Sequence, residues 1–376
     1  MRNSFVRLTM AFFFLTIVWT AVSAQIVPFD SDRWEIRANE STILDHLGQK
    51  SLFMKNGLAL VKGSVFTDGV IEFDIAFTGE RGFMGAVWRA EDFMNYEEFY
   101  LRPHQSGQPD ANQYEPVANG VETWQLYYGE RYAAPVKYDF NQWVHVKIIV
   151  SGRHAEMYIK EMTTPVLIIS ELKREIVSGG VGLRVGEFSG AYFSNFQFTA
   201  MNNPPLKGKS KAPEQALPGT VKTWMVSNAF ERKSLEKKYQ LASDEKQKLR
   251  WTRLGCETSG LANLALVQGI QDGKNTAFAK VVIHSEREQV KKVTFGFSDA
   301  VMVYFNDRLI YGGNDGYRTR DHRFLGTIGL FDELWLPMKK GENELWMAVT
   351  EDFGGWGLMA RFEDMSGIRF EEGSKE

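Results

Sequence analysis

Apolar and polar residues alternate along much of the chain after residue 58, which is the period of half-buried β-strands. In the run 70–77 every second residue is Ile or Phe, and Glu72 and Asp74 face the other way. Comparable runs predict strands over 82–89, 98–104, 122–128, 143–151, 155–159, 180–185 and 191–199. Turn residues separate most of these runs and no long segment has a helical period, so the pattern predicts an antiparallel β-sandwich.

A second series of strands is predicted in the C-terminal part. The runs 301–305 and 309–311 are rich in β-branched and aromatic residues, and Asn306-Asp307 lies between them. Both turn residues tolerate positive φ, so the segment predicts a hairpin. After the Gly-rich loop 312–321, further strands are expected over 330–336, 344–349 and 353–360. Only 233–248 could hold a helix, and its dense charge and thin apolar face fit a short helix or a loop equally.

The composition changes between the two series of strands. Residues 202–220 contain several Pro and clustered Lys and few apolar residues, which is typical of a semi-extended linker. We therefore predict an all-β chain with two antiparallel β-sandwich (jelly-roll) domains, 25–201 and 221–367, joined by this Pro/Lys-rich linker. Residues 368–376 are predicted to form a polar tail.

The N-terminus has the pattern of a secretory signal peptide. Arg2 and Arg7 form a basic region, an apolar run follows over 8–19, and Val22-Ser23-Ala24 fits the small-residue cleavage rule. Cleavage after Ala24 would deliver a secreted or periplasmic protein with no membrane span. No Cys follows the apolar run, so a lipoprotein anchor is not expected.

Composition narrows the function classes further. The length of 376 residues suits two domains, and a net charge of -3 indicates no nucleic-acid partner. Aromatic residues make up 13% of the chain, which serves either large β cores or sugar-binding faces. The single Cys256 excludes an internal disulfide and is expected to be a buried, small apolar residue.

The first series of strands resembles a known fold family. Val87-Trp88-Arg89 and the runs 99–102, 143–147 and 180–183 are similar in order and spacing to the concanavalin A-like lectin/glucanase (laminin-G-like) sandwich, over about 28–200. The resemblance implies that aromatic and polar residues of a concave sheet and its loops hold a saccharide.

The second series resembles another family. The Asn306 hairpin, the turn and strand 340–345 and Gly355-Trp356-Gly357 are similar to the galactose-binding-like β jelly rolls attached to β-galactosidases and many secreted polysaccharide-active enzymes. The resemblance implies a fold more than an activity, because such modules often catalyse no reaction. We expect Trp356 to seal the core against Val303 and Leu345.

The catalytic signature of laminarinase-type glucanases is incomplete in this sequence. Those enzymes carry a Glu-x-Asp-x-x-Glu strand that places two catalytic carboxylates on one face. Glu72 and Asp74 match its first two positions, but Phe77 occupies the third. We therefore interpret Glu72 and Asp74 as the polar side of an ordinary strand.

Aromatic and cationic residues of the first sandwich are candidates for a saccharide site. Tyr and Trp stack on the C–H faces of sugar rings, while Arg, His and Gln hydrogen-bond to hydroxyls. The alternative is that many of these side chains fill the core. The candidate residues are Trp88, Arg89, Tyr100, Arg102, His104, Gln125 and Tyr127.

The loop 312–321 provides further candidates, Asn314, Asp315 and Arg318, since sugar-binding jelly rolls use loops at the end of the sandwich. Asp315 and Asp321 could contribute to a structural calcium site, although their spacing matches no dedicated calcium loop. No other cofactor is expected. The sequence has no Gly-x-Ser-x-Gly elbow, phosphate loop or dinucleotide fingerprint, and its His spacing supports no zinc site.

We therefore predict an exported, largely non-catalytic carbohydrate-binding protein whose partner is an oligo- or polysaccharide. One alternative is a glycoside hydrolase or polysaccharide lyase with its site on the first sandwich, for which Glu97 or Glu98 would be tested first. The other is a protein-interaction or matrix module, because laminin-G-like folds also bind proteins.

Overall fold

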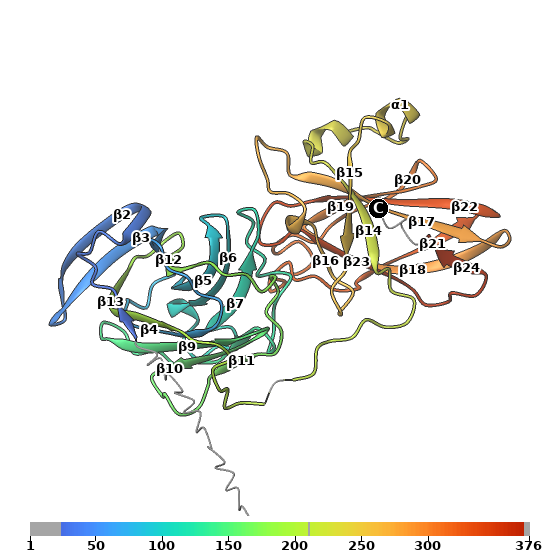
Figure 1. The fold of residues 1–376 in the computed structure, drawn as a ribbon. Coiled ribbons are helices and arrows are strands. Elements are labelled where there is room, and N and C mark those ends of the chain that lie inside the picture. The colour runs from blue at the N-terminus through green and yellow to red at the C-terminus, as the bar shows by residue number, and fades with distance from the viewer. Residues whose placement is uncertain (1–23, 210, 372–376) are drawn as a thin grey trace, which may run out of the picture.

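The computed structural model describes residues 24–209 and 211–371, which fold almost entirely as β-strands (Figure 1). The strands form one sheet of thirteen strands in the N-terminal part and two sheets of seven and four strands in the C-terminal part. Over these described ranges, helix is confined to three short 3-10 turns and the four-residue α1 (Ser243–Lys246). The predicted all-β fold with antiparallel, sandwich-like sheets is confirmed.

The N-terminal sheet runs in the order β11-β10-β9-β4-β13-β3-β12-β5-β6-β7-β8, with β1 paired to β13 and β2 to β3. A 3-10 turn, η1 (Pro103–Gln105), follows β6. The strands are β1 (Gln25–Ile26), β2 (Trp34–His46), β3 (Gln49–Val61), β4 (Gly69–Ala76), β5 (Met84–Asp92), β6 (Asn95–Leu101), β7 (Asn112–Val117), β8 (Ala133–Ala134), β9 (Val144–Ser151), β10 (His154–Ile159), β11 (Leu167–Ile169), β12 (Gly180–Val185) and β13 (Ala191–Ala200).

The long hairpin of β2 and β3 turns this sheet into two layers. The first half of β3 pairs with β13, and its second half pairs with β12. Between the halves, Asn56 has a φ of 44°, and a side chain on Gly57 would come within 2.3 Å of Ala38. The bend therefore depends on a residue that tolerates positive φ and on a glycine that allows close strand approach. The two layers enclose the first core, which includes Phe73 from one layer and Phe99 from the other.

The C-terminal part is a second sandwich. Its seven-stranded sheet runs β15-β14-β17-β22-β19-β20, with β24 paired to β17, and its four-stranded sheet runs β16-β23-β18-β21. The elements are β14 (Thr223–Ser227), η2 (Arg232–Leu235), β15 (Trp251–Gly255), β16 (Ala262–Asn263), η3 (Leu264–Leu266), β17 (Thr276–Ser285), β18 (Gln289–Ser298), β19 (Ala300–Phe305), β20 (Arg308–Asn314), β21 (Asp332–Met338), β22 (Gly341–Thr350), β23 (Gly357–Phe362) and β24 (Ile368–Phe370).

Two local predictions for this sandwich hold in the structure. Asn306 and Asp307, with φ of 48° and 71°, form the turn between β19 and β20. Trp356 is fully buried in the same core cluster as Val303 and Leu345, and its indole Nε1 donates to the Val349 carbonyl at 3.0 Å. The closing tryptophan is therefore part of the core.

The predicted strand over 122–128 is wrong, because this segment is a series of turns. Its backbone groups bond outside any sheet: the Thr123 amide donates to the Glu115 carboxylate, and the Gln125 amide donates to the Gly354 carbonyl. The alternation of apolar residues here serves contact with the C-terminal sandwich. The region 233–248, for which the sequence predicts either a short helix or a loop, contains the end of η2, a loop and α1.

Between β13 and β14 the chain is extended, with no strand or helix among its described residues apart from a single bridge of Thr220 to Arg361 (Figure 1). Its first part lies on β10, where Glu156 accepts from the Lys207 amide at 2.8 Å. The predicted signal peptide lies outside the described residues except for Ala24. No helix in the described ranges is long and apolar enough to cross a membrane.

Candidate functional site

The outer face of β12, β5, β6 and β7 carries polar and aromatic side chains in register. Glu98 on β6 lies opposite Glu115 on β7, and two pairs further along Tyr100 lies opposite Gln113. Gly85 on β5 lies opposite Tyr100. Because alternate residues of a strand point to opposite faces, these side chains share the face that points away from the core.

Arg102, just beyond the end of β6, organises one end of this face. Its guanidinium donates to the Tyr100 hydroxyl at 3.0 Å and to Gln113, and it pairs with Asp110 at 2.8 Å. The Gln113 amide in turn donates to the Trp124 carbonyl at 3.0 Å. This network fixes the backbone that carries Trp124 beside Arg102.

Five partly exposed aromatic rings form a surface band that we call the aromatic strip: Phe188, Phe83, Trp124, Phe353 and Tyr317. At one end Phe83 is 6.2 Å from Phe188, and at the other Phe353 lies 5.5 Å from Trp124 and 6.1 Å from Tyr317, measured between ring centroids. Phe188, Phe353 and Tyr317 are 47%, 49% and 40% exposed.

Arg102 lies between Phe83 and Trp124 of the aromatic strip, and its guanidinium is 5.8 Å from the Phe83 ring and 5.7 Å from the Trp124 ring. His104 lies 5.4 Å from Phe83, and Arg318 lies 4.8 Å from the Tyr317 ring at the far end. Exposed rings and nearby nitrogen donors thus follow one another from the N-terminal to the C-terminal sandwich.

Gln125 fixes the junction of the two sandwiches beneath the strip. Its side-chain amide donates to the Leu325 carbonyl at 2.7 Å and accepts from the Ser298 hydroxyl at 3.1 Å. Gly354, with a φ of 91°, approaches so closely that a Cβ there would lie 2.5 Å from the Trp124 Nε1. The contact between Trp124 and Phe353 therefore depends on this close backbone approach.

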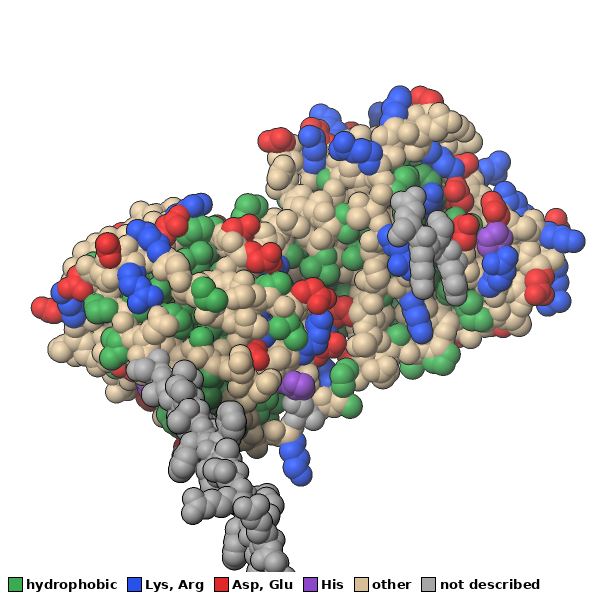
Figure 2. Space-filling view, viewed as in Figure 1, with side chains coloured by type: hydrophobic (Ala, Val, Ile, Leu, Met, Phe, Trp, Pro, Cys, Tyr) green, Lys and Arg blue, Asp and Glu red, His purple; other side chains and the backbone are tan. Residues whose placement is uncertain are grey.

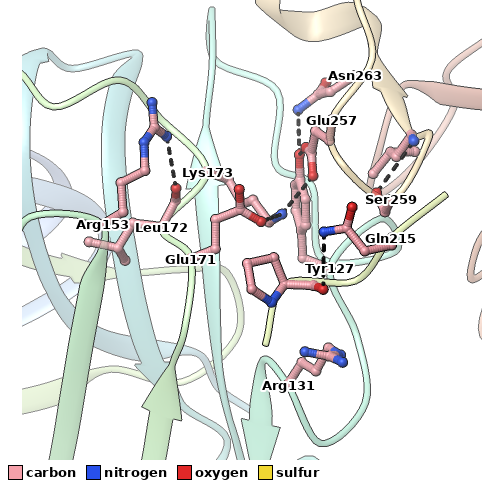
Figure 3. A network of polar contacts seen from close by, with 12 residues as sticks. Tyr127, Arg131, Arg153, Glu171, Leu172, Lys173, Gln215, Glu257, Ser259 and Asn263 are labelled. Atoms are coloured by element: carbon pink, nitrogen blue, oxygen red, sulfur yellow. Dashed lines mark hydrogen bonds and ion pairs between the residues drawn. The ribbon is translucent and has the colours of Figure 1, made fainter. Parts of the chain in front are cut away.

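A buried polar network holds the same junction from the other side (Figure 3). The Tyr127 hydroxyl donates to the Glu257 carboxylate, which also pairs with Lys173 at 2.7 Å, and Lys173 reaches Glu171 at 2.9 Å. Burial alone would lower the pKa of Lys173, but the neighbouring carboxylates raise it above its ordinary value. Lys173 therefore remains charged and links the two sandwiches.

The structure places the sequence-predicted candidates in three settings. Tyr100, Arg102 and His104 are brought together at the aromatic strip. Gln125 and Tyr127 are buried in the junction. Trp88 and Arg89 lie elsewhere: Trp88 stacks on Tyr114 in the first core with centroids 6.2 Å apart, and buried Arg89 pairs with Asp68 at 2.9 Å.

The three loop candidates also differ in setting. Arg318 is exposed beside Tyr317, whereas Asp315 is buried and paired with Arg320. Asn314 is exposed and accepts from the Gly316 amide at 2.9 Å. Asp321 pairs with Arg323 at 3.1 Å, so both carboxylates considered for calcium are engaged by arginines. No group of three or more metal-ligating side chains occurs in the part of the chain that the structure describes.

The sequence prediction missed Phe83, Phe188 and Phe353 and did not select Trp124 or Tyr317. Phe83 precedes β5 and Phe188 follows β12, while Phe353 lies between β22 and β23. The only sequence signal for these positions is an aromatic residue beside a turn. Many turns in this chain contain such a residue, so the signal does not single out the strip.

Next to the strip lies a carboxyl cluster of Glu98, Glu115 and Glu122 around Arg184. Arg184 pairs with Glu98 at 2.8 Å and also with Glu122. Burial raises the pKa of Glu98 to about 7 and holds that of Glu115 well above its usual range. Glu97, the other carboxylate considered for catalysis, points to the opposite face and accepts from the Tyr114 hydroxyl at 2.5 Å.

No family model matches the sequence, and no curated protein matches it. Solved structures similar to this chain include a carbohydrate-binding module, CBM66, from Bacillus subtilis, with 17% identity, 45% of this chain and 96% of that chain covered, and a TM-score of 0.35. A protein with a galectin-like fold from Bacillus subtilis has 14% identity, coverage of 48% and 96%, and a TM-score of 0.36.

A β-glucanase from Bacillus licheniformis has 10% identity, coverage of 48% and 100%, and a TM-score of 0.34. We draw nothing on function from likenesses of this size.

Proposed function

We propose that the protein binds a carbohydrate chain along the aromatic strip without cleaving it. The observation that carries the proposal is the row of partly exposed rings on both sides of Arg102. Such rings offer flat apolar platforms for the C–H faces of successive sugar units. His104 and Arg318 supply donors for the hydroxyl groups. An extended oligosaccharide fits this band better than a single sugar does, because the rings continue from one sandwich to the next.

The proposal includes export, with the signal peptide cleaved after Ala24 to give a secreted or periplasmic protein. The position of the first strand supports this cleavage site: Gln25 already pairs with Phe198 of β13. Cleavage after Ala24 would therefore leave this strand intact. N-terminal sequencing of the exported protein checks the site, and a first residue beyond Ile26 would contradict it.

A glycan-array screen of the chain from Gln25 onward identifies the ligand, and titration calorimetry with the best glycan tests the site. We expect Trp124→Ala and Phe353→Ala each to weaken binding by about 1–3 kcal/mol, as for an aromatic anchor. Trp335→Ala is the matched control, because Trp335 is a 64% exposed aromatic residue of β21 outside the strip. Normal folding and parental affinity of both strip variants would exclude the strip as the site.

The carboxyl cluster favours one second candidate, cleavage of the bound glycan by hydrolysis. Glycoside hydrolases need one carboxyl group that carries a proton and another that is ionised. Burial holds the pKa of Glu115 well above its usual range and raises the pKa of Glu98 to about 7, and the two residues face each other across β6 and β7. Both are buried, so this role requires the glycan to displace Glu122, whose side chain is 41% exposed.

Measurement of new reducing ends on a glycan that the parent binds separates the two candidates. Hydrolysis predicts release by the parent near pH 7 and loss of release in Glu98→Gln and Glu115→Gln, whereas the exposed Glu187→Gln control stays active. Binding without any release by the parent would exclude hydrolysis of that glycan and leave the binding function standing.

A further inference from the structure

The outer face of the seven-stranded sheet in the C-terminal sandwich carries a hollow that is separate from the aromatic strip. The segment between β14 and β15, with η2 and α1, covers this face (Figure 1). The hollow has a volume of about 170 Å³. A cavity of roughly 150 Å³ holds one benzene ring. Its apolar lining consists of Phe230, Leu235, Leu241, Leu249, Phe278 and Trp346.

A second, more polar hollow of about 350 Å³ lies beside the first, and Leu235 lines both. The register of the sheet relates the two. Phe278 in the first hollow lies opposite Ala348, which lies opposite Met302 in the second hollow. Adjacent strands are about 4.8 Å apart, so the two hollows lie roughly 10 Å from one another. The small side chain of Ala348 leaves little between them on the sheet.

The charges differ between the two hollows. In the first, the cations are already paired: Lys238 with Glu245, and Lys246 with both Asp307 and Glu344 at 2.7 Å. Few donors or acceptors are left there for the hydroxyl groups of a sugar, so an apolar ring suits it better.

The second hollow is basic. It is lined by Arg232, Lys233 and Lys237 with a single acid, Glu236. Within residues 24–209 and 211–371, neither Lys233 nor Lys237 has an ion pair, while Arg232 reaches Asp352 at 3.2 Å. Figure 2 shows basic side chains, with acidic ones among them, over the end of the C-terminal sandwich where α1 lies. An anionic group is therefore the complementary partner for this hollow.

We propose that the two hollows together bind a small aromatic carboxylate. Its ring occupies the first hollow, among Phe230, Phe278 and Trp346, and its carboxylate points over Leu235 toward Lys233 and Lys237. The aromatic walls supply edge and face contacts to the ring, and the two lysines supply the charge. This site does not depend on the aromatic strip, so its test is independent of the carbohydrate-binding function.

Titration calorimetry with cinnamate tests the proposal on the whole exported chain, and cinnamyl alcohol is the neutral match of nearly equal shape. We expect saturable binding of one cinnamate, weakened by salt. The parent should bind the alcohol about tenfold more weakly than cinnamate. The Lys233→Ala/Lys237→Ala double variant should bind cinnamate more weakly than the parent by a similar factor, because two exposed charge contacts typically contribute about this much. The exposed Lys55→Ala on β3 is the charge control.

A second variant keeps the test meaningful if the charge effect is small. Ser234 lines the rim of the first hollow and is exposed, so Ser234→Trp should fill the hollow without disturbing the core. We expect cinnamate binding to be lost in this variant, with unchanged thermal melting. Absence of saturable binding to the parent, equal affinity for cinnamyl alcohol, or parental affinity in Ser234→Trp would each overturn the proposal.

Discussion

Trp124 and Phe353 meet edge to face with their ring centroids 5.5 Å apart, although they belong to opposite sandwiches. This pair is where the N-terminal and C-terminal halves of the aromatic strip meet. An edge-to-face pair of this kind is worth about 0.5–1.5 kcal/mol beyond its buried area. The strip therefore has the shape required for an extended ligand only while the two sandwiches remain docked.

We predict that Gly354→Ala impairs carbohydrate binding without removing any aromatic residue. A Cβ at Gly354 would lie 2.5 Å from the Trp124 Nε1, so Trp124 must move away from Phe353. Titration with the array-selected glycan should show a loss similar to that of Trp124→Ala.

Gly341→Ala is the matched control for that substitution. Gly341 has a φ of 93°, close to the 91° of Gly354, but a Cβ there meets nothing within 4 Å. Both variants should lose about 1 kcal/mol of folding free energy from backbone strain, while only Gly354→Ala loses affinity. Equal affinities in the two variants would separate Trp124 from the binding site.

We predict that the surface triad of His145, Asp74 and Glu72 makes stability depend on pH. The hydrogen bond to Asp74 and the contact with the Glu72 carboxylate, 3.7 Å from Nε2, raise the pKa of His145 to about 9. The nearby His145 ring also lowers the pKa of Glu72, and for Asp74 hydrogen bonds outweigh the effect of burial, which alone would raise the pKa. His145 on β9 lies directly opposite Asp74 on β4, with 2.7 Å between the His145 Nδ1 and the Asp74 Oδ1.

A histidine whose pKa is raised on folding stabilises the fold fully below its unfolded value of about 6.5. That contribution is lost as the pH rises through about 9, and the carboxylate contribution is lost at acid pH. The difference in melting temperature between the parent and His145→Gln should therefore be largest near pH 6 and close to zero at pH 10. His154→Gln, at a histidine without an ion pair in the described residues, should show no such trend.

Trp356→Ala should destabilise the C-terminal sandwich by about 3–5 kcal/mol, as for a buried tryptophan replaced by alanine. Trp356 is fully buried, and its indole hydrogen bond to Val349 would also be lost. Thermal or urea unfolding measures the loss, with Trp335→Ala as the exposed control. A melting temperature close to that of the parent would contradict the core role.

The alternating pattern of 70–77 predicted the inner face of β4 correctly because strand faces depend on local sequence. The same rule of alternating faces did not predict the position of the Arg89 side chain. The pairing of β5 with β6 shifts register after Trp88, and Arg89 has a φ of 49°, so its side chain turns toward Asp68. A break in register is invisible to a pattern that assumes regular strands.

Position along the strand also decides the roles of Glu97 and Glu98, because a shift of one residue moves a side chain to the other face.

The aromatic strip could not be predicted for a different reason. Trp124 and Phe353 become neighbours only through the packing of one sandwich on the other, and that packing depends on buried contacts such as those of Gln125 and Glu257. No local pattern in the sequence encodes this arrangement.

The last prediction concerns the domain boundary predicted within 202–220. Proteolytic cleavage there should leave the two sandwiches assembled. The segment 211–215 is exposed and lies outside the sheets, so limited proteolysis should cut there first. We expect the two fragments to elute together, because the network of Tyr127, Lys173 and Glu257 still joins them. Glu257→Gln removes one of the two carboxylates that pair with Lys173, the one that belongs to the C-terminal sandwich, and breaking a buried pair is costly. The cut Glu257→Gln variant should therefore separate into two folded fragments on size exclusion, whereas cut Glu286→Gln, at an exposed glutamate between β17 and β18, should not. A first cut within 295–363 would contradict the boundary, and separation of the cut parent would show that the junction is weaker than its contacts indicate.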